Sequence, residues 1–147
     1  MKVVLGLTLL AAADAFATAA RRAAPRMGLD VGEPFPPAAL ASWGVKGKNA
    51  VIYFYGADGA PSCTKEAAAF DAAGLGCAVV GVRNEGGVKP GFAEAYPGIR
   101  FVVDEGDQVR GELGIAKDFL FLGGRETYVV DKAGTVASVF NAQFAPE

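Results

Sequence analysis

A strand passes into a helix within the stretch Val51-Ile52-Tyr53-Phe54-Tyr55-Gly56-Ala57-Asp58-Gly59-Ala60-Pro61-Ser62-Cys63-Thr64-Lys65-Glu66. The run from Val51 to Tyr55 is apolar and contains β-branched and aromatic residues, which is typical of a buried strand. Pro61 suits the first position of a helix because its φ angle is already fixed and it has no N–H to leave unpaired. The sequence therefore predicts that Cys63 lies in the first turn of a helix.

The first turn of a helix is a place where a cysteine can become reactive. Unpaired backbone N–H groups and the positive end of the helix dipole stabilise a thiolate relative to a thiol. Free cysteines also pack commonly in apolar cores, which is the alternative interpretation. The polar neighbours Ser62, Thr64 and Lys65 favour the reactive one.

Two separate motifs resemble the peroxiredoxin Q (bacterioferritin comigratory protein) branch of the peroxiredoxins. The first is Tyr53-Phe54-Tyr55-Gly56-Ala57-Asp58 with Pro61-Ser62-Cys63-Thr64-Lys65-Glu66-Ala67, and the second is Gly123-Gly124-Arg125-Glu126-Thr127-Tyr128-Val129-Val130-Asp131-Lys132 with Phe140-Asn141-Ala142-Gln143-Phe144. With a weaker match from Ala78 to Ile115, the resemblance covers most of the chain from about Val31 onward. It implies an α/β, thioredoxin-like fold with a mixed central sheet flanked by helices.

The resemblance also implies a thiol peroxidase site. Cys63 takes the part of the peroxidatic cysteine, whose thiolate attacks the O–O bond of hydrogen peroxide or a small alkyl hydroperoxide and becomes a sulfenic acid. Arg125 matches the catalytic arginine of the family, and its fixed fork of donors can hold both the sulfur and the peroxide. Glu66 matches an acidic residue that holds this arginine in relatives. Without the resemblance, Arg125 is a surface arginine and Glu66 a solvated helix residue.

The chain departs from the family pattern close to Cys63. Ala60 stands where the family usually has Thr or Ser, so a hydroxyl that would bond the thiolate and the peroxide is missing. Hydrogen bonds to charged groups are worth roughly 1.5–3 kcal/mol, so attack is expected to slow by roughly ten to a few hundredfold unless Ser62 or Thr64 replaces that hydroxyl. The alternative function is a catalytically weakened, peroxiredoxin-like redox sensor or binding partner. Gly56 replaces the family's proline at the start of the loop.

A second cysteine is present, but its position does not suit resolution of the first. Many members of this branch carry a resolving cysteine where this chain has Ala68, and Cys77 opens the apolar run up to Val82. A disulfide needs Cα atoms within about 7 Å, which would demand local unfolding here. We therefore expect a monomer with a one-cysteine cycle, in which thioredoxin, a glutaredoxin or glutathione reduces the sulfenic acid.

Composition excludes several other classes of enzyme. The chain has no histidine and two cysteines, so Ser-His-Asp and Cys-His nucleophile schemes and common catalytic zinc sites are ruled out. Glu66 occupies the third position after Cys63, so there is no CxxC dithiol motif. Neither a P-loop nor a dinucleotide-binding glycine pattern occurs. We expect no metal and no cofactor.

The N-terminal segment reads as a targeting sequence that precedes the folded domain. An apolar run from Val3 to Ala13 and the small residues around Phe16 indicate a signal peptide, and a basic, acid-free stretch follows up to Leu29. This bipartite pattern resembles the plastid presequence of algae with secondary plastids, and plain secretion is the alternative. Residues 30–147 then form one domain with ten basic and fifteen acidic residues, so neither nucleic acid nor, after processing, a membrane is expected as a partner.

The periodicity of the domain predicts alternating strands and helices followed by a hairpin. The expected strands are Ala50 to Tyr55, Cys77 to Val82, Ile99 to Val103, Glu126 to Val130 and Thr135 to Phe140, and the expected helices are Pro61 to Ala73, Phe92 to Tyr96 and Asp107 to Leu113. Relatives continue into a C-terminal helix where this sequence stops at Glu147. That helix is apparently missing, so one face of the sheet is expected to lack part of its cover.

Overall fold

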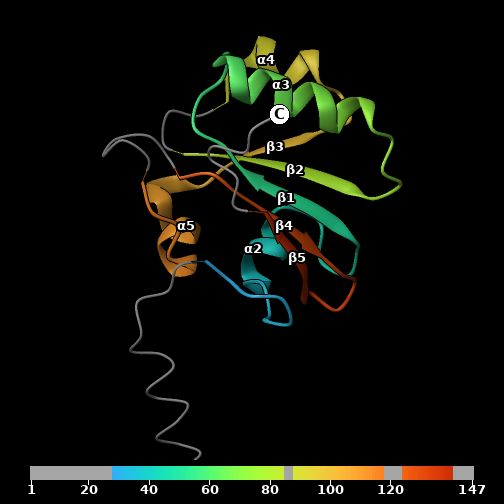
Figure 1. The fold of residues 1–147 in the computed structure, drawn as a ribbon, viewed down its shortest axis with the longest axis vertical. Helices are drawn as coiled ribbons and strands as arrows, with labels where there is room; N and C mark the ends of the chain where they lie inside the picture. Colours follow the sequence, from blue (N-terminus) through green and yellow to red (C-terminus); the bar gives the residue numbers. More distant parts are fainter. Residues whose placement is uncertain (1–27, 85–87, 118–123, 141–147) are drawn as a thin grey trace, which may run out of the picture.

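A five-stranded mixed sheet forms the centre of the computed structural model, which describes residues 28–84, 88–117 and 124–140 (Figure 1). The strand order is β3-β2-β1-β4-β5. The strands are β1 (Ala50–Phe54), β2 (Ala78–Arg83), β3 (Arg100–Val103), β4 (Glu126–Val130) and β5 (Val136–Phe140). The helices are α2 (Pro37–Ser42), α3 (Pro61–Ala72), α4 (Pro90–Ala95), the 3₁₀ turn η1 (Glu105–Asp107) and α5 (Gln108–Leu113).

The sheet joins a parallel half to an antiparallel half at its central strand. β1 pairs in parallel with β2, and β2 pairs in parallel with β3. On its other side β1 pairs antiparallel with β4, which continues into the hairpin with β5. All five residues of β1 are buried, as expected for a central strand covered on both faces. The predicted order of strands and helices and the mixed thioredoxin-like sheet are confirmed, with element ends shifted by one or two residues.

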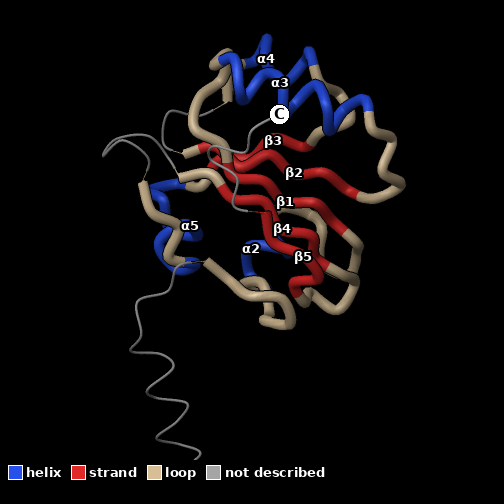
Figure 2. Tube along the Cα trace, viewed as in Figure 1, coloured by secondary structure: helices blue, strands red, loops and turns tan. Residues whose placement is uncertain are grey.

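Helices cover the sheet from both sides (Figure 2). α3 and α4 lie over one face, and α2 and α5 lie over the other. Because side chains alternate along a strand, β1 feeds both layers of the core. Ile52 and Phe54 join the cluster under α2 and α5, whereas Val51 and Tyr53 join the cluster under α3.

The helix α2 was not predicted from the sequence. Pro36 caps it without a side-chain hydrogen bond, Pro37 occupies its first position, and Ala39 and Leu40 are its buried residues. A helix of six residues shows too little of a 3.6-residue period to be recognised, and isolated helices of this length are unstable in water. Its stability comes from tertiary packing, in which the following residue Trp43 also takes part.

The hairpin carries the less covered part of the α3 face. Thr127, Val129 and Ser138 lie on this face and are half-buried, and Phe140 is 59% exposed. The expected absence of a C-terminal helix concerns the chain after residue 140, which lies outside the described residues, and it stays a prediction.

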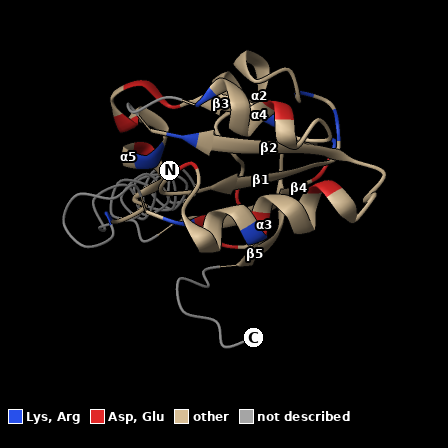
Figure 3. Ribbon diagram, turned by 90° about the horizontal axis from the view of Figure 1, so that it is seen from above, with Lys and Arg blue, Asp and Glu red and all other residues tan. Residues whose placement is uncertain are grey.

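Charged residues are spread over the described surface. Figure 3 marks acidic and basic residues along the ribbon, with both kinds on α3 and no continuous basic stripe among the described residues in this view. Over the same residues, no helix has the length and apolar character that crossing a bilayer requires.

Candidate active site

The pairing of β1 with β4 brings the two halves of the candidate site to the same edge of the sheet. Phe54, the last residue of β1, lies opposite Glu126, the first residue of β4. The chain that leaves β1 leads to Cys63, and Arg125 directly precedes β4. Continuing the register places Arg125 opposite Tyr55, on the face that α3 covers. Two segments far apart in sequence therefore meet beside the start of α3.

The loop between β1 and α3 is held by side chains at several points. Asp58 accepts a hydrogen bond from the Tyr55 hydroxyl at 2.7 Å and another from the backbone N–H of Lys89 at 2.6 Å. Arg83 donates from Nη1 to the carbonyl oxygen of Gly56, and its Nε lies 3.7 Å from Asp58 Oδ1. These contacts come from three segments of the chain. They hold the loop in one conformation, so that α3 begins at a fixed place over the sheet.

Cys63 lies in the first turn of α3, as predicted. Pro61 is the first residue of the helix, and Ala60 is its N-cap with φ −65° and ψ 139°. No side chain caps the helix, since alanine has no oxygen to offer to the free N–H groups. Cys63 is 3% exposed and packs in the apolar cluster that contains Tyr53 and Ala67. A small reagent therefore has far better access to this sulfur than a bulky one.

Arg125 contacts α3 on both sides of Cys63 in sequence. Its Nη1 donates to Ser62 Oγ at 3.2 Å, and its Nη2 donates to Glu66 Oε2 at 2.9 Å. Residues four apart lie on one face of a helix, so one guanidinium spans Ser62 and Glu66. The structure thus brings Arg125 and Glu66 into direct contact, and it places Cys63 in the same first turns of α3. It adds the Ser62–Arg125 contact, which the sequence did not indicate.

Burial dominates the electrostatics of the two titratable groups beside Cys63. Desolvation raises the pKa of Glu66, and the hydrogen bond and charge of Arg125 offset part of that rise. Desolvation also raises the pKa of Tyr53 strongly, with smaller contributions from Glu66 and Cys63. The Tyr53 hydroxyl is buried without a hydrogen-bond partner among the described residues.

Cys77 lies at the far end of α3 from Cys63. The helix continues to Ala72, and at 1.5 Å per residue the nine residues from Cys63 to its end span roughly 13 Å. Cys77 comes after that end and directly before β2. Both cysteines are free. A bridge between them would require α3 to unwind, because the Cα atoms of a disulfide lie within about 7 Å.

The described residues hold no group of three or more His, Cys, Asp or Glu side chains that could bind a metal ion. The polar groups at the start of α3 are a thiol, a guanidinium, a carboxylate and a hydroxyl. Such a set suits nucleophilic chemistry on a small polar substrate.

Comparison with known proteins agrees with this arrangement. Residues 21–139 match the AhpC/TSA family. The chain belongs to the AhpC/TSA family. Among curated relatives in this family, it is 44% identical over 110 residues to the chloroplastic peroxiredoxin Q of Sedum lineare, with 69% of this chain and 59% of the relative covered. It is 42% identical over 110 residues to the chloroplastic peroxiredoxin Q of Triticum aestivum, with 69% and 51% covered. The resemblance to peroxiredoxin Q is confirmed.

Solved structures at low sequence identity share the fold. Reduced Prx3 of Vibrio vulnificus in complex with H₂O₂ matches with a TM-score of 0.60 and 17% identity, covering 81% of this chain and 92% of that chain. A PrxQ mutant of Xylella fastidiosa matches with a TM-score of 0.61 and 14% identity, covering 80% and 89%. The chain spans about half the length of the curated peroxiredoxin Q relatives that it matches, 59% and 51% for the two named above.

Proposed function

We propose that the protein is a thiol peroxidase that reduces hydrogen peroxide and small alkyl hydroperoxides through Cys63. The observation that carries the proposal is that the Arg125 guanidinium donates hydrogen bonds to Ser62 and Glu66. Ser62 directly precedes Cys63 in α3, and Glu66 follows it by three residues. Family membership and the similarity to peroxiredoxin Q support it. The low exposure of the Cys63 side chain favours small peroxides over bulky ones.

In the proposed reaction, the Cys63 thiolate attacks the terminal oxygen of the peroxide. A sulfur–oxygen bond forms as the O–O bond breaks, so the sulfur is oxidised to a sulfenic acid and the other oxygen leaves as hydroxide or alkoxide. The departing anion takes a proton from water. Arg125 holds the peroxide and stabilises the negative charge that passes from sulfur to the leaving oxygen. Glu66 holds Arg125 in place.

An external thiol completes the proposed cycle. The thiol condenses with the Cys63 sulfenic acid, releasing water and leaving a mixed disulfide, and a second thiol then reduces that disulfide. Thioredoxin, a glutaredoxin or glutathione can supply these thiols. The position of Cys77 beyond the end of α3 supports reduction of Cys63 by an external thiol. We also propose that the protein acts as a monomer.

The proposed location of the protein is the plastid. Its curated relatives from Sedum lineare and Triticum aestivum are named chloroplastic, and a plastid supplies the reduced thiols that the cycle needs. Residues 1–29, the expected presequence before the domain at 30–147, fall almost entirely outside the described residues. Fusing residues 1–29 to a fluorescent protein in a plastid-bearing alga tests this location, with secretion as the contrary outcome.

The catalytic proposal is tested by stopped-flow measurement of peroxide consumption with an excess of a thioredoxin system. Wild type, Cys63→Ser and Cys77→Ser are compared, and a 1,3-dicarbonyl reagent followed by mass spectrometry locates the sulfenic acid. We expect Cys63→Ser to be inactive and Cys77→Ser to keep the wild-type rate. Equal consumption by wild type and Cys63→Ser would refute the proposal.

A second function is favoured by one observation, the alanine at the N-cap of α3. A peroxiredoxin fold that lacks the hydroxyl usually found there can serve as a slow redox sensor or binding partner. In that case oxidation of Cys63 is slow, and peroxide consumption by wild type stays close to that of Cys63→Ser even with an excess of reductant. The same stopped-flow experiment separates the two functions.

A further inference from the structure

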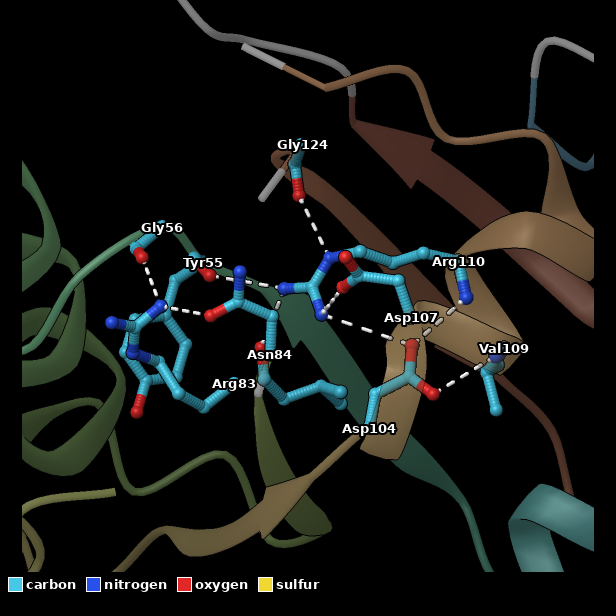
Figure 4. Close-up of polar contacts among 10 residues, drawn as sticks. Tyr55, Gly56, Arg83, Asn84, Asp104, Asp107, Val109, Arg110 and Gly124 are labelled. Atoms are coloured by element: carbon cyan, nitrogen blue, oxygen red, sulfur yellow. Dashed lines mark hydrogen bonds and ion pairs between the residues drawn. The ribbon is translucent and has the colours of Figure 1, made fainter. Parts of the chain in front are cut away.

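A second arginine lies at the junction of the segments that carry Cys63 and Arg125. Arg110, in α5, is 2% exposed, and its side chain reaches across the ends of the strands (Figure 4). Its Nη2 donates to the carbonyl oxygens of Tyr55 and Val82, both at 3.0 Å. Its Nε donates to the carbonyl oxygen of Gly124 at 3.4 Å. One guanidinium therefore binds the main chain at the ends of β1 and β2 and just before β4.

Two of these carbonyl groups belong to the segments that form the candidate active site. Tyr55 opens the loop that leads to Cys63, and Gly124 is the residue before Arg125. The hydrogen bonds of Arg110 thus connect the backbone on the thiol side of the site with the backbone on the arginine side.

Arg110 itself is held in a fixed orientation. Asp104 accepts the backbone N–H groups of Val109 at 2.9 Å and of Arg110 at 3.0 Å, which fixes the start of α5. Arg110 Nη1 lies 3.8 Å from Asp104 Oδ2 and 3.6 Å from Asp107 Oδ1, and the guanidinium carbon lies 5.1 Å from the centre of the Phe54 ring. A planar guanidinium held by these contacts allows the strand ends little movement relative to one another.

Arg83 also binds the start of this loop. Arg83 donates to the carbonyl oxygen of Gly56, directly after the Tyr55 carbonyl that Arg110 holds, and to Asn84 Oδ1 at 2.5 Å (Figure 4). Two consecutive carbonyl groups at the start of the loop are therefore bound by two arginines. The loop that presents Cys63 is anchored at its origin as well as at Asp58.

We propose that Arg110 is a positioning residue for the peroxidase site, which sets the Arg125 guanidinium relative to Cys63 by binding the backbone on both sides. The inference rests on the proposed function. Arg110 is buried and does not meet the substrate. Its effect is on the alignment that peroxide cleavage needs, because misplacement of catalytic groups by about 1 Å can cost roughly a hundredfold in rate.

The test compares two reactions of the same sulfur in Arg110→Lys. Reaction with hydrogen peroxide needs Arg125 in place, whereas alkylation by iodoacetamide breaks no O–O bond and depends on the thiol and its accessibility. Lysine keeps the positive charge, but its single ammonium cannot reproduce the fork of donors. We expect the ratio of the peroxide rate constant to the alkylation rate constant to fall at least tenfold.

Arg100→Lys is the matched control. Arg100 also donates to a backbone carbonyl, that of Trp43 at 3.0 Å, but at a part of the fold away from Cys63 and Arg125. Its ratio should stay within twofold of wild type. An unchanged ratio in Arg110→Lys, or equal changes in both rate constants, would overturn the positioning role and leave the peroxidase proposal intact. A wild type that does not react with peroxide would refute the proposed function itself.

Arg110→Gln is a second variant that keeps one N–H donor set of the side chain. We expect its ratio to fall at least as far as that of Arg110→Lys. Circular dichroism and thermal unfolding are recorded for every variant. If Arg110→Lys and Arg110→Gln both fail to fold while Arg100→Lys folds, Arg110 is a requirement of the fold rather than of the site, and the inference is wrong.

Discussion

Two arginines with opposite surroundings frame the candidate site. The Arg125 side chain is 21% exposed and bonds a hydroxyl and a carboxylate, whereas the Arg110 side chain is 3% exposed and bonds main-chain carbonyl groups. Burial lowers the pKa of Arg110, and Asp107 and Asp104 counteract that change. The difference shows how one residue type serves two purposes. An arginine that meets a substrate needs solvent access and partners that can yield, and an arginine that holds a scaffold needs fixed acceptors.

The largest effect is expected from Arg125→Lys. A lysine ammonium cannot span Ser62 and Glu66 and hold a peroxide at the same time, so the rate of Cys63 oxidation should fall by about 10²-fold, as for loss of one preorganised donor. Stopped-flow measurement of the oxidation step checks this value, with Arg100→Lys as the control. A stability close to wild type is expected in urea unfolding. A small loss of rate with a large loss of stability would reverse the roles of the two arginines.

Asp104→Asn tests how much the buried ion pair between Asp104 and Arg110 contributes to stability. The substitution removes the carboxylate that caps α5 and faces Arg110, and breaking a buried charge pair costs about 3 kcal/mol of unfolding free energy. Urea unfolding followed by circular dichroism measures this loss. Glu66→Gln makes the same carboxylate-to-amide change at a partly exposed position. If the two variants lose the same free energy of unfolding, the contacts of Arg110 with Asp104 and Asp107 are not the rigid part of the site.

Ala60→Thr should increase both the stability of the protein and the rate at which Cys63 reacts with peroxide. A threonine hydroxyl at the N-cap can accept a backbone N–H of α3, which adds about 1 kcal/mol of stability. Next to Cys63 the same hydroxyl should raise the peroxide rate by about tenfold, the effect of roughly 1.4 kcal/mol. Ala60→Ser is the matched variant with the smaller side chain. A gain in stability without a gain in rate would show that Ser62 already supplies the hydroxyl that the reaction needs.

Glu66→Gln is expected to have the smallest effect. The amide oxygen can still accept from Arg125, and partly exposed ion pairs contribute about 0.2–1 kcal/mol, so the peroxide rate should fall by no more than about fivefold. Stopped-flow oxidation of Cys63 measures it. A loss as large as that of Arg125→Lys would make Glu66 a full partner in the chemistry.

The same variant reports on the pKa of Glu66. Because burial raises this pKa, the folded protein binds the proton more tightly than the unfolded chain. Stability linked to the group is complete below the unfolded pKa of about 4.3 and is lost as the pH rises through the folded value. Wild type should therefore gain stability relative to Glu66→Gln on acidification. A relative loss on acidification would show that the ion pair with Arg125 outweighs desolvation.

The sequence predicted the parts of the fold that local chemistry specifies. Pro61 and the helix formers after it indicated α3, and the apolar run before Gly56 indicated β1. The turn Asp131-Lys132-Ala133-Gly134 indicated the hairpin, and Gly134 has the positive φ of 82° that such a turn requires. The contact between Arg125 and Glu66 was expected from the family resemblance, and the β1–β4 register allows it.

Other features depend on tertiary contacts that no local pattern encodes. Arg110 stands in Gln108-Val109-Arg110-Gly111, which looks like a solvated helix turn, and it is buried only because four segments converge on it. The contact of Ser62 with Arg125 joins residues 63 positions apart. The short helix α2 carries no side-chain cap to signal its start. Each becomes visible only when the strands are in register.

The antiparallel pairing of β1 with β4 has a consequence for a chain that emerges from the ribosome N-terminus first. Phe54 cannot pair with Glu126 until the ribosome has synthesised β4. Until then the thiol has no guanidinium opposite it, and a shift of one residue in the register would turn Arg125 to the opposite face. In the proposed reaction, the help that Arg125 gives to peroxide cleavage therefore begins only after β4 has been synthesised and paired with β1.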